Sequence, residues 1–286
     1  MALISEVAKM TTTIKPFDVY SNTHALDKPV LDAVATRLEE RGKHPTFQRM
    51  LNEYLNSMKI DSVQSVLDLG CGTGFVAREI AVRSGFKGRV VGIDISPHLI
   101  DQATKLATDE GSSDRIEFRV GDTRRLKLPD DSFDAVVAHT LVSHLPDPLV
   151  VIKEMVRVVK PGGLIGVFDG DYASLTFSHP DAQQGKAYDE LIINSCVTQP
   201  RVMRQLPLLL STAGLEFVTA YAYVVSDIGT ADYWATSVES MRKLLPAAKA
   251  MTVEDASGWA NARMQESENG TFFASSNYYS YVARKP

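Results

Sequence analysis

The sequence predicts an α/β fold in which helices cover both faces of a doubly wound, mostly parallel sheet. Three observations predict it. From residue 65 onward, short apolar runs alternate with segments of helical periodicity. The runs are too apolar for a strand with one solvated face, and buried parallel strands have this composition. A glycine-rich turn joins the first run directly to a helix.

Elements follow from the pattern in chain order. Apolar positions at helical spacing predict two helices over 27–58, with a break at Gly42 and Pro45. Strands and helices then alternate. The predicted segments are strand 65–69, helix 74–84, strand 89–94, a helix from Pro97, strands 115–120 and 133–139, helix 148–160 and strand 164–169.

The alternation weakens after the strand that ends at residue 169. Residues 200–213 have helical periodicity, and 215–225 and 280–285 have the composition of strands. The connection between these two strands, 226–276, is mostly compatible with helix. Connections of this length in a compact domain are typically functional lids or caps.

These long connections suggest a domain organisation. We expect cap insertions at about 172–199 and 226–276 to cover, together with the N-terminal helices, the edge where the strands' carboxyl ends lie. We therefore expect an N-terminal helical segment over 1–60 and a sheet domain over 61–286.

Composition narrows the class of protein. Of 286 residues, 44% are hydrophobic and 23% charged, which is ordinary globular usage. No apolar run approaches the roughly 20 residues of a membrane span, and MALISEVAKM lacks the features of a secretory signal. Two cysteines are too few for a disulfide framework, and no Cys/His spacing is typical of a zinc site. These features predict a cytoplasmic protein without a metal or an integral membrane segment.

The charge balance disfavours a nucleic-acid partner. The net charge is −5, whereas nucleic-acid binders carry a basic field that neutralises phosphates. The densest basic run is Arg124, Arg125 and Lys127, and Asp130 and Asp131 follow it at once. That mixture is typical of a solvated loop.

The segment VLDLGCGTGF contains the strongest motif. Gly70, Gly72 and Gly74 form the turn that opens a helix, where backbone can approach a ligand closely. A dinucleotide motif would have a third glycine at Phe75. Asp68 inside the strand would repel a pyrophosphate, but it suits a ligand with an ammonium and a sulfonium. The alternative is a tight turn without a ligand.

Two further acids follow predicted strands at the same edge. Asp94 can accept hydrogen bonds from ribose hydroxyls. The alternative for Asp94 is an N-cap of the next helix, a position that Ser96 suits better. Asp122 can accept a hydrogen bond from an adenine amino group, although an Asx-turn is the alternative.

These motifs together resemble class I S-adenosylmethionine (SAM)-dependent methyltransferases, nearest to the small-molecule, ubiquinone-biosynthesis-type branch (methyltransferase type 11). DLGCGTG, GID, GD, LPDDSFDAVVA, LVSHLPDP and MVRVVKPGG carry the resemblance, which covers about residues 60–170. It implies a Rossmann-like sheet of seven strands, one of them antiparallel because the last hairpin is reversed. It also implies SAM as cofactor and S-adenosylhomocysteine (SAH) as product.

The resemblance also implies roles along the cofactor. The methionine part lies at the glycine turn, the ribose at the end of the second strand and the adenine after the third, while the segment after the fourth strand lies near the amino-acid end. The candidate cofactor-binding residues are Asp68, Gly70, Gly72, Gly74, Asp94, Ile95, Asp122, Thr123, His139 and Thr140.

Methyl transfer from a sulfonium mainly requires alignment and exclusion of water, and a base helps when the acceptor is a hydroxyl, an ammonium or a C–H acid. His144, after the fourth strand, is the first choice for that base because histidine titrates near neutral pH. Asp171 and Tyr172, after the fifth strand, are further candidates. The alternatives are that His144 only caps its loop and that an aspartate of FDGDY only binds the N-terminal helices.

Three residues are candidates for binding the acceptor. Arg201 and Arg204 can hold a carboxylate or phosphate with two parallel hydrogen bonds. Tyr20 precedes the N-terminal helices that we expect over the site. Solvated surface arginines are the alternative for the first two.

The sequence thus predicts a SAM-dependent methyltransferase that modifies O, N or C of a small metabolite, such as a natural-product intermediate. A hydrophobic quinone or polyprenyl acceptor, or SAM binding without catalysis, are the alternatives. The missing third glycine and Asp68 disfavour a nucleotide-dependent oxidoreductase. HTLVSH, in place of an Asn/Asp-Pro-Pro-aromatic motif, disfavours a nucleic-acid methyltransferase. We expect a monomer or a homodimer.

Overall fold

A computed structural model describes residues 18–286. The stretch MALISEVAKM, to which the prediction about a secretory signal refers, lies outside the described residues. Within them, seven strands form one sheet in the order β3-β2-β1-β4-β5-β7-β6. The strands are β1 (Ser65–Leu69), β2 (Arg89–Asp94), β3 (Ile116–Val120), β4 (Phe133–His139), β5 (Val159–Phe177), β6 (Glu216–Gly229) and β7 (Phe272–Arg284).

Strand directions confirm the predicted fold class. The first five strands pair in parallel, and β7 is antiparallel to both of its neighbours, β5 and β6. The strand order reverses at β1, which pairs with β2 on one side and β4 on the other. In open α/β sheets, ligands bind outside the carboxyl ends of the strands at such a reversal.

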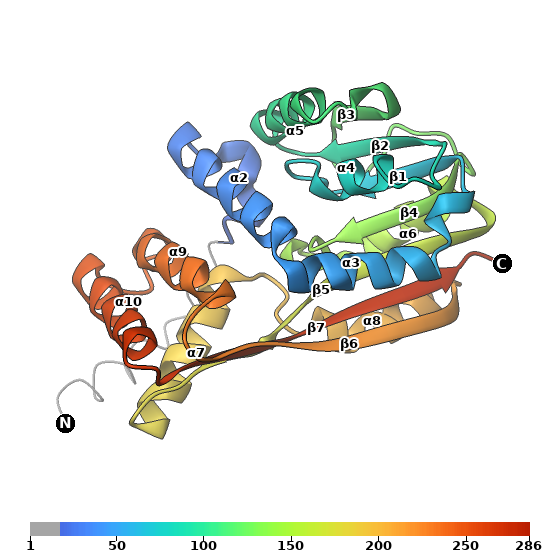
Figure 1. Cartoon of the computed structure of the whole chain (residues 1–286). Helices are drawn as coiled ribbons and strands as arrows, with labels where there is room; N and C mark the ends of the chain where they lie inside the picture. Colours follow the sequence, from blue (N-terminus) through green and yellow to red (C-terminus); the bar gives the residue numbers. More distant parts are fainter. Residues whose placement is uncertain (1–17) are drawn as a thin grey trace.

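Helices cover both faces of this sheet (Figure 1). The longer ones are α2 (Lys28–Lys43), α3 (Pro45–Ser57), α4 (Phe75–Ala81), α5 (Pro97–Asp109), α6 (Pro148–Val158), α7 (Ala182–Cys196), α8 (Val202–Thr212), α9 (Tyr233–Ala247) and α10 (Val253–Glu268). The short 3-10 turns are η1 (Tyr20–Ala25), η2 (Ile60–Ser62), η3 (Ser113–Arg115) and η4 (Val142–His144). The predicted break in the N-terminal helices is confirmed between α2 and α3.

The apolar core has one layer on each face of the sheet. Alternate residues of β1 point to opposite layers: Val66 packs with α3 and α4, and Leu67 packs with α6 and α8. On the first face, Met58 just after α3 comes so close to Gly166 of β5 that a Cβ there would lie 2.3 Å from its sulfur. The helix therefore lies directly against the sheet.

The expected cover of the carboxyl edge is wrong in part. Of the N-terminal elements, η1 and α2 cover that edge and α3 reaches it at Phe47, while Tyr54 and the other apolar residues of α3 pack against a sheet face (Figure 1). The cap helix α9 contacts α2 through side-chain hydrogen bonds. Arg37 of α2 donates hydrogen bonds to Thr236 and Ser237 of α9.

Several predicted lengths are also wrong. β5 and β7 extend well beyond 164–169 and 280–285, and their extensions pair with each other or with β6, as in Thr176↔Ser275 and Ile228↔Phe273. The extended segment ASSNYYSY has buried serines where strands usually have apolar residues, so pattern alone did not identify it. The insertion 226–276 therefore begins and ends as strand.

The predicted helix 74–84 is too long in a similar way. The helix α4 ends at Ala81, and the residues after it turn toward β2. Helix ends are weakly encoded, since fraying and capping decide them.

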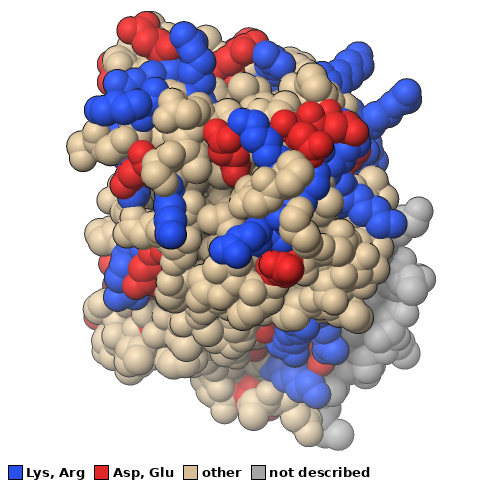
Figure 2. All heavy atoms as spheres, turned by 90° about the vertical axis from the view of Figure 1, so that its right-hand side faces the viewer, with Lys and Arg blue, Asp and Glu red and all other residues tan. Residues whose placement is uncertain are grey.

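On the face of the molecule that Figure 2 shows, Lys and Arg side chains are interspersed with Asp and Glu side chains. This face therefore has no large patch of one charge. Among the helices of the described residues, none has the length and apolar character that crossing a membrane requires.

The cap helix α7 offers a stability test away from the sheet edge. Oδ1 of Asp181 accepts hydrogen bonds from the backbone N–H groups of Gln183 and Gln184, each 2.9 Å long. Asp181→Ala is therefore expected to lower the free energy of unfolding by about 1 kcal/mol. Denaturant unfolding measures this, with Asp181→Asn as the control that keeps a capping oxygen. Equal stability of Asp181→Ala and the wild type would contradict the cap.

Candidate active site

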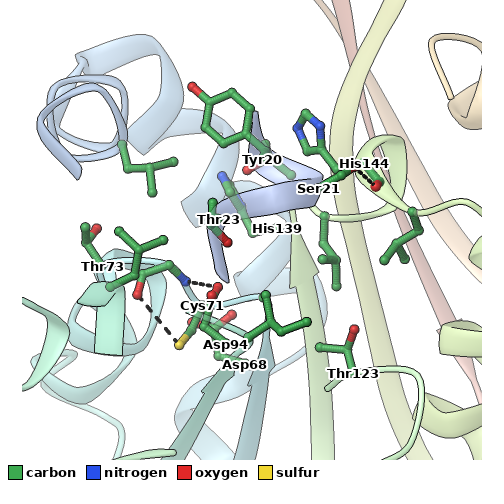
Figure 3. A pocket seen from close by; sticks show the side chains of 18 of the residues that line it. Tyr20, Ser21, Thr23, Asp68, Cys71, Thr73, Asp94, Thr123, His139 and His144 are labelled. Carbon is green, nitrogen blue, oxygen red and sulfur yellow. Dashed lines mark hydrogen bonds between the residues drawn. The ribbon is translucent and has the colours of Figure 1, made fainter. Parts of the chain in front are cut away.

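A cavity of about 730 Å³ lies at the carboxyl edge of the sheet, within the size range of small-molecule sites. Its walls are the ends of β1, β2 and β4 and the loops that follow them, and η1 and α2 cover it. Figure 3 shows Asp68 and Asp94 beside the strand ends, with Tyr20 and His144 across the pocket.

The glycine turn after β1 contributes part of the wall. Gly70 and Gly72 have φ values of +66° and +54°, which favour glycine, and both line the cavity. Gly74, predicted to bind the cofactor, is absent from the lining. A Cβ on Gly74 would lie 2.4 Å from the ring of Phe118, so this glycine permits close packing of the turn against β3.

Asp68 is a buried acid that faces this cavity. Its side chain is 1% exposed, and within the described residues its Oδ2 has no hydrogen-bond partner. Burial, with a smaller contribution from the charge of Asp94, raises the pKa of Asp68 to about 8. A buried carboxyl without a partner is costly, so this position favours a ligand with a hydrogen-bond donor or a cation.

Asp94 ends β2 and supports the glycine turn. Its Oδ2 accepts a hydrogen bond from the backbone N–H of Gly72, and its Oδ1 accepts one from Ser96, both at 2.9 Å. Ser96 itself caps α5 by accepting from Leu99. Since the cap position is filled by Ser96, the carboxylate of Asp94 is left at the cavity wall.

The predicted adenine-side residues also line the cavity, as does Ile95. Both carboxylate oxygens of Asp122 contact the guanidinium of Arg124, at 2.7 to 3.1 Å, and this arginine lowers the pKa of Asp122. Thr123 is buried. The carboxylate that we expected to receive an adenine amino group is thus already an acceptor for Arg124.

His144 lies at the opposite end of the cavity, in η4. Its Nδ1 is 2.8 and 3.0 Å from Oδ2 and Oδ1 of Asp18. The same Oδ2 accepts hydrogen bonds from the backbone N–H and the hydroxyl of Thr198. Burial opposes protonation of His144, but the charge and hydrogen bond of Asp18 raise its pKa above the ordinary value. The contact leaves Nε2 as the nitrogen not held by Asp18.

His139, at the end of β4, has a different environment. Its Nδ1 is 3.1 Å from the hydroxyl of Tyr54, and its ring stacks on Phe168 with centroids 4.4 Å apart. Burial, together with the charge of Arg41, holds the pKa of His139 well below the ordinary value. The cavity therefore contains one neutral imidazole and one that Asp18 favours as a cation.

Other predicted residues do not line the cavity. The carboxylate of Asp171 is buried and accepts hydrogen bonds from Nε of Arg204 at 2.9 and 3.0 Å. Arg201 is exposed at the start of α8. The ring of Tyr172 lies near that of His144, with ring centroids 6.2 Å apart. Asp171 and Arg204 thus form an ion pair with each other. The catalytic or substrate-binding roles of Asp171, Tyr172, Arg201 and Arg204 stay predictions.

Sequence reasoning missed Asp18 and Arg41, although both line the cavity. Asp18 is part of FDVY, which matches no motif, and Arg41 is one charge among several in TRLEERGK. Each meets its partner only in the folded chain, at His144 and Thr140, about 100 or more positions away. Tyr20 and Thr140, which we did predict, also line the cavity.

Comparison with known proteins identifies the central part of the chain. Residues 67–167 match the family described as "Methyltransferase domain". The chain is 43% identical over 114 residues to sterol 24-C-methyltransferase erg6 of Aspergillus fumigatus, which is 40% of this chain and 30% of that protein. It is 43% identical over 105 residues to 2-methyl-6-phytyl-1,4-hydroquinone methyltransferase of Synechocystis sp., which is 37% of this chain and 31% of that protein.

The fold has solved counterparts. One is the cyclase SpnF, with a TM-score of 0.55 and 22% identity, over 83% of this chain and 80% of that one. This likeness shows the common fold. The chain spans less than a third of the length of each of the two methyltransferases above.

Proposed function

We propose that this chain, which carries a methyltransferase domain over residues 67–167, transfers a methyl group from SAM to a small molecule. The observation that carries the proposal is the buried carboxyl of Asp68, which has no partner on Oδ2 among the described residues and faces a cavity at the glycine turn. The ammonium of SAM is a suitable partner for that oxygen.

The remaining cofactor-side residues fit the same ligand. Asp94 offers a carboxylate to ribose hydroxyls. Gly70 and Gly72 present backbone without a side chain at the wall where the methionine part would lie. Thr123 and Ile95 line the wall at the end where an adenine would lie. SAM, when bound, supplies a methyl group on a positively charged sulfur.

His144 is our candidate for the general base. Asp18 holds Nδ1, so Nε2 is the nitrogen that can take a proton from an acceptor. Asp18 positions the ring without touching the reacting atoms. Ser21 of η1 donates a hydrogen bond to the backbone carbonyl of His144 and pairs with Thr198, so the cover of the cavity is attached to the same loop. This attachment helps to exclude water.

The acceptor is a small molecule that fits a partly apolar site beneath η1 and α2. Leu38, Phe47, Leu141 and Leu145 line the cavity with the polar groups. The relatives above are named for a sterol and a phytyl hydroquinone. A hydrophobic quinone or polyprenyl acceptor is therefore the second candidate.

We further propose that the protein is cytoplasmic, since two cysteines in 286 residues suit a reducing compartment. We propose a monomer or a homodimer as its oligomeric state.

Calorimetric titration tests the proposal directly. The purified protein should bind SAM and SAH, and it should not bind NADH. If the folded protein binds neither SAM nor SAH, the proposed function is wrong.

The same titration should detect proton release from Asp68. Its pKa of about 8 keeps the carboxyl largely protonated at pH 7, and an ammonium beside it would lower that pKa. Binding of SAM at pH 7 is thus expected to release most of one proton, measured by titration in buffers of different ionisation enthalpy. In Asp68→Asn this release should disappear. Equal release by this variant and the wild type would contradict the assignment.

A further inference from the structure

Arg41 of α2 lines the cavity without a carboxylate partner among the described residues. Its Nη2 donates a hydrogen bond of 2.7 Å to the hydroxyl of Thr140, just after β4. The other arginine in the lining, Arg124, is bound by Asp122 on both oxygens. Buried or half-buried cations are usually paired, because desolvation of an unpaired guanidinium is costly.

No acid is prominent among the ionisable groups around Arg41. The groups that interact electrostatically with it are Tyr20, Tyr172, Tyr233, Tyr278, His139 and His144. Burial raises the pKa of Tyr20, Tyr172 and Tyr278, so these three hydroxyls are neutral near pH 7. Asp18 favours the charged form of His144.

Among the described residues, Arg41 is the cation in the lining that no carboxylate balances. Asp18 also lines the cavity under η1 and α2, but it is paired with His144, which Figure 3 shows across the pocket from Asp68 and Asp94. Asp122, in the loop after β3, is paired with Arg124. A ligand that carries an anion under the helical cover would neutralise Arg41.

We propose that Arg41 is the binding site for a carboxylate of a ligand in this cavity. A guanidinium holds a carboxylate with two parallel N–H···O bonds, and Thr140 fixes one of its nitrogens. This inference rests on the proposed function, in which two ligands can bring a carboxylate: the methyl acceptor, or the amino-acid end of the cofactor. Both give the same chemistry at Arg41.

Two variants on one helix test the site. Arg41→Gln removes the charge. Arg37→Gln removes a charge from α2 one turn away, where the guanidinium contacts Thr236 and Ser237 and does not line the cavity. Arg41→Lys keeps a charge but loses the planar fork, and it serves if Arg41→Gln does not fold. Circular dichroism and thermal unfolding establish that each variant is folded.

Calorimetry with four probes then separates the two sources. SAH has the amino-acid end and 5′-methylthioadenosine lacks it. Benzoate, titrated into SAH-loaded protein, is the probe for an acceptor carboxylate, and benzamide is its neutral control. If the cofactor supplies the carboxylate, Arg41→Gln should lower the affinity for SAH about tenfold or more and leave the affinity for 5′-methylthioadenosine unchanged. If the acceptor supplies it, Arg41→Gln should leave the affinity for SAH unchanged and lower the affinity for benzoate about tenfold or more.

Other outcomes overturn the proposal. Unchanged SAH and benzoate affinities in a folded Arg41 variant would do so, as would an equal loss in Arg37→Gln or equal binding of benzoate and benzamide. Failure of the proposed function is a separate result. In that case the wild type would bind neither SAH nor 5′-methylthioadenosine, while benzoate titrated into the free protein would still report on Arg41.

Discussion

Replacing His144 with Gln is expected to lower kcat about 100- to 10,000-fold, because the variant loses the group that accepts a proton from the acceptor. Affinity for SAH should stay within about twofold of the wild type, since His144 lies across the cavity from Asp68 and Asp94 (Figure 3). Transfer of labelled methyl from SAM into a metabolite extract provides the first assay, and the acceptor found there provides the second.

The pH dependence separates a base from a structural histidine. His144 accepts a proton only when neutral, and Asp18 raises its pKa, so kcat/KM of the wild type should fall as pH decreases through a value above 6.5. Asp18→Asn removes the stabilising charge, so burial should then lower that pKa and move the acidic limb to lower pH. His144→Gln should have no such limb. A limb that persists unchanged in His144→Gln would discard this residue as the base.

The parallel half of the sheet was accessible from sequence because its signals are local. Each strand from β1 to β4 is a short apolar run, and the glycines after β1 require positive φ. Parallel strands bring their carboxyl ends to one edge. Asp68 and Asp94 were therefore predicted at one site from the strand pattern and the motifs, and the family resemblance added His139.

The pattern failed where strand and loop have similar composition. We placed the end of the fifth strand at residue 169 and expected Asp171 and Tyr172 in a loop over the site. β5 instead continues to Phe177, and Asp171 pairs in register with Asn277 of β7. Its carboxylate therefore points away from the cavity lining, to Arg204 of α8.

Asp94→Ala is expected to weaken SAH binding by about 1.5–3 kcal/mol, or roughly 10- to 150-fold, because a charge-assisted acceptor for the ribose hydroxyls is lost. 5′-Methylthioadenosine retains that ribose, so its affinity should fall by a similar factor. Calorimetric titration with both ligands measures this. The pair of ligands also distinguishes Asp94 from Asp68 and Arg41, whose proposed partners belong to the amino-acid end or to the acceptor.

Asp94 also braces the glycine turn, and the control must separate this role from ligand binding. Gly72 donates to one oxygen of Asp94 and Ser96 to the other. Asp94→Asn keeps an oxygen and an N–H group in the same shape, so it should keep much of the brace while losing the charge. If binding depends on charge-assisted hydrogen bonds to ribose, Asp94→Asn should weaken both ligands well beyond its effect on thermal stability. Unchanged affinity for both ligands in Asp94→Ala would show that Asp94 does not bind the ligand. If affinity falls only as far as the loss of thermal stability explains, Asp94 acts only by stabilising the glycine turn.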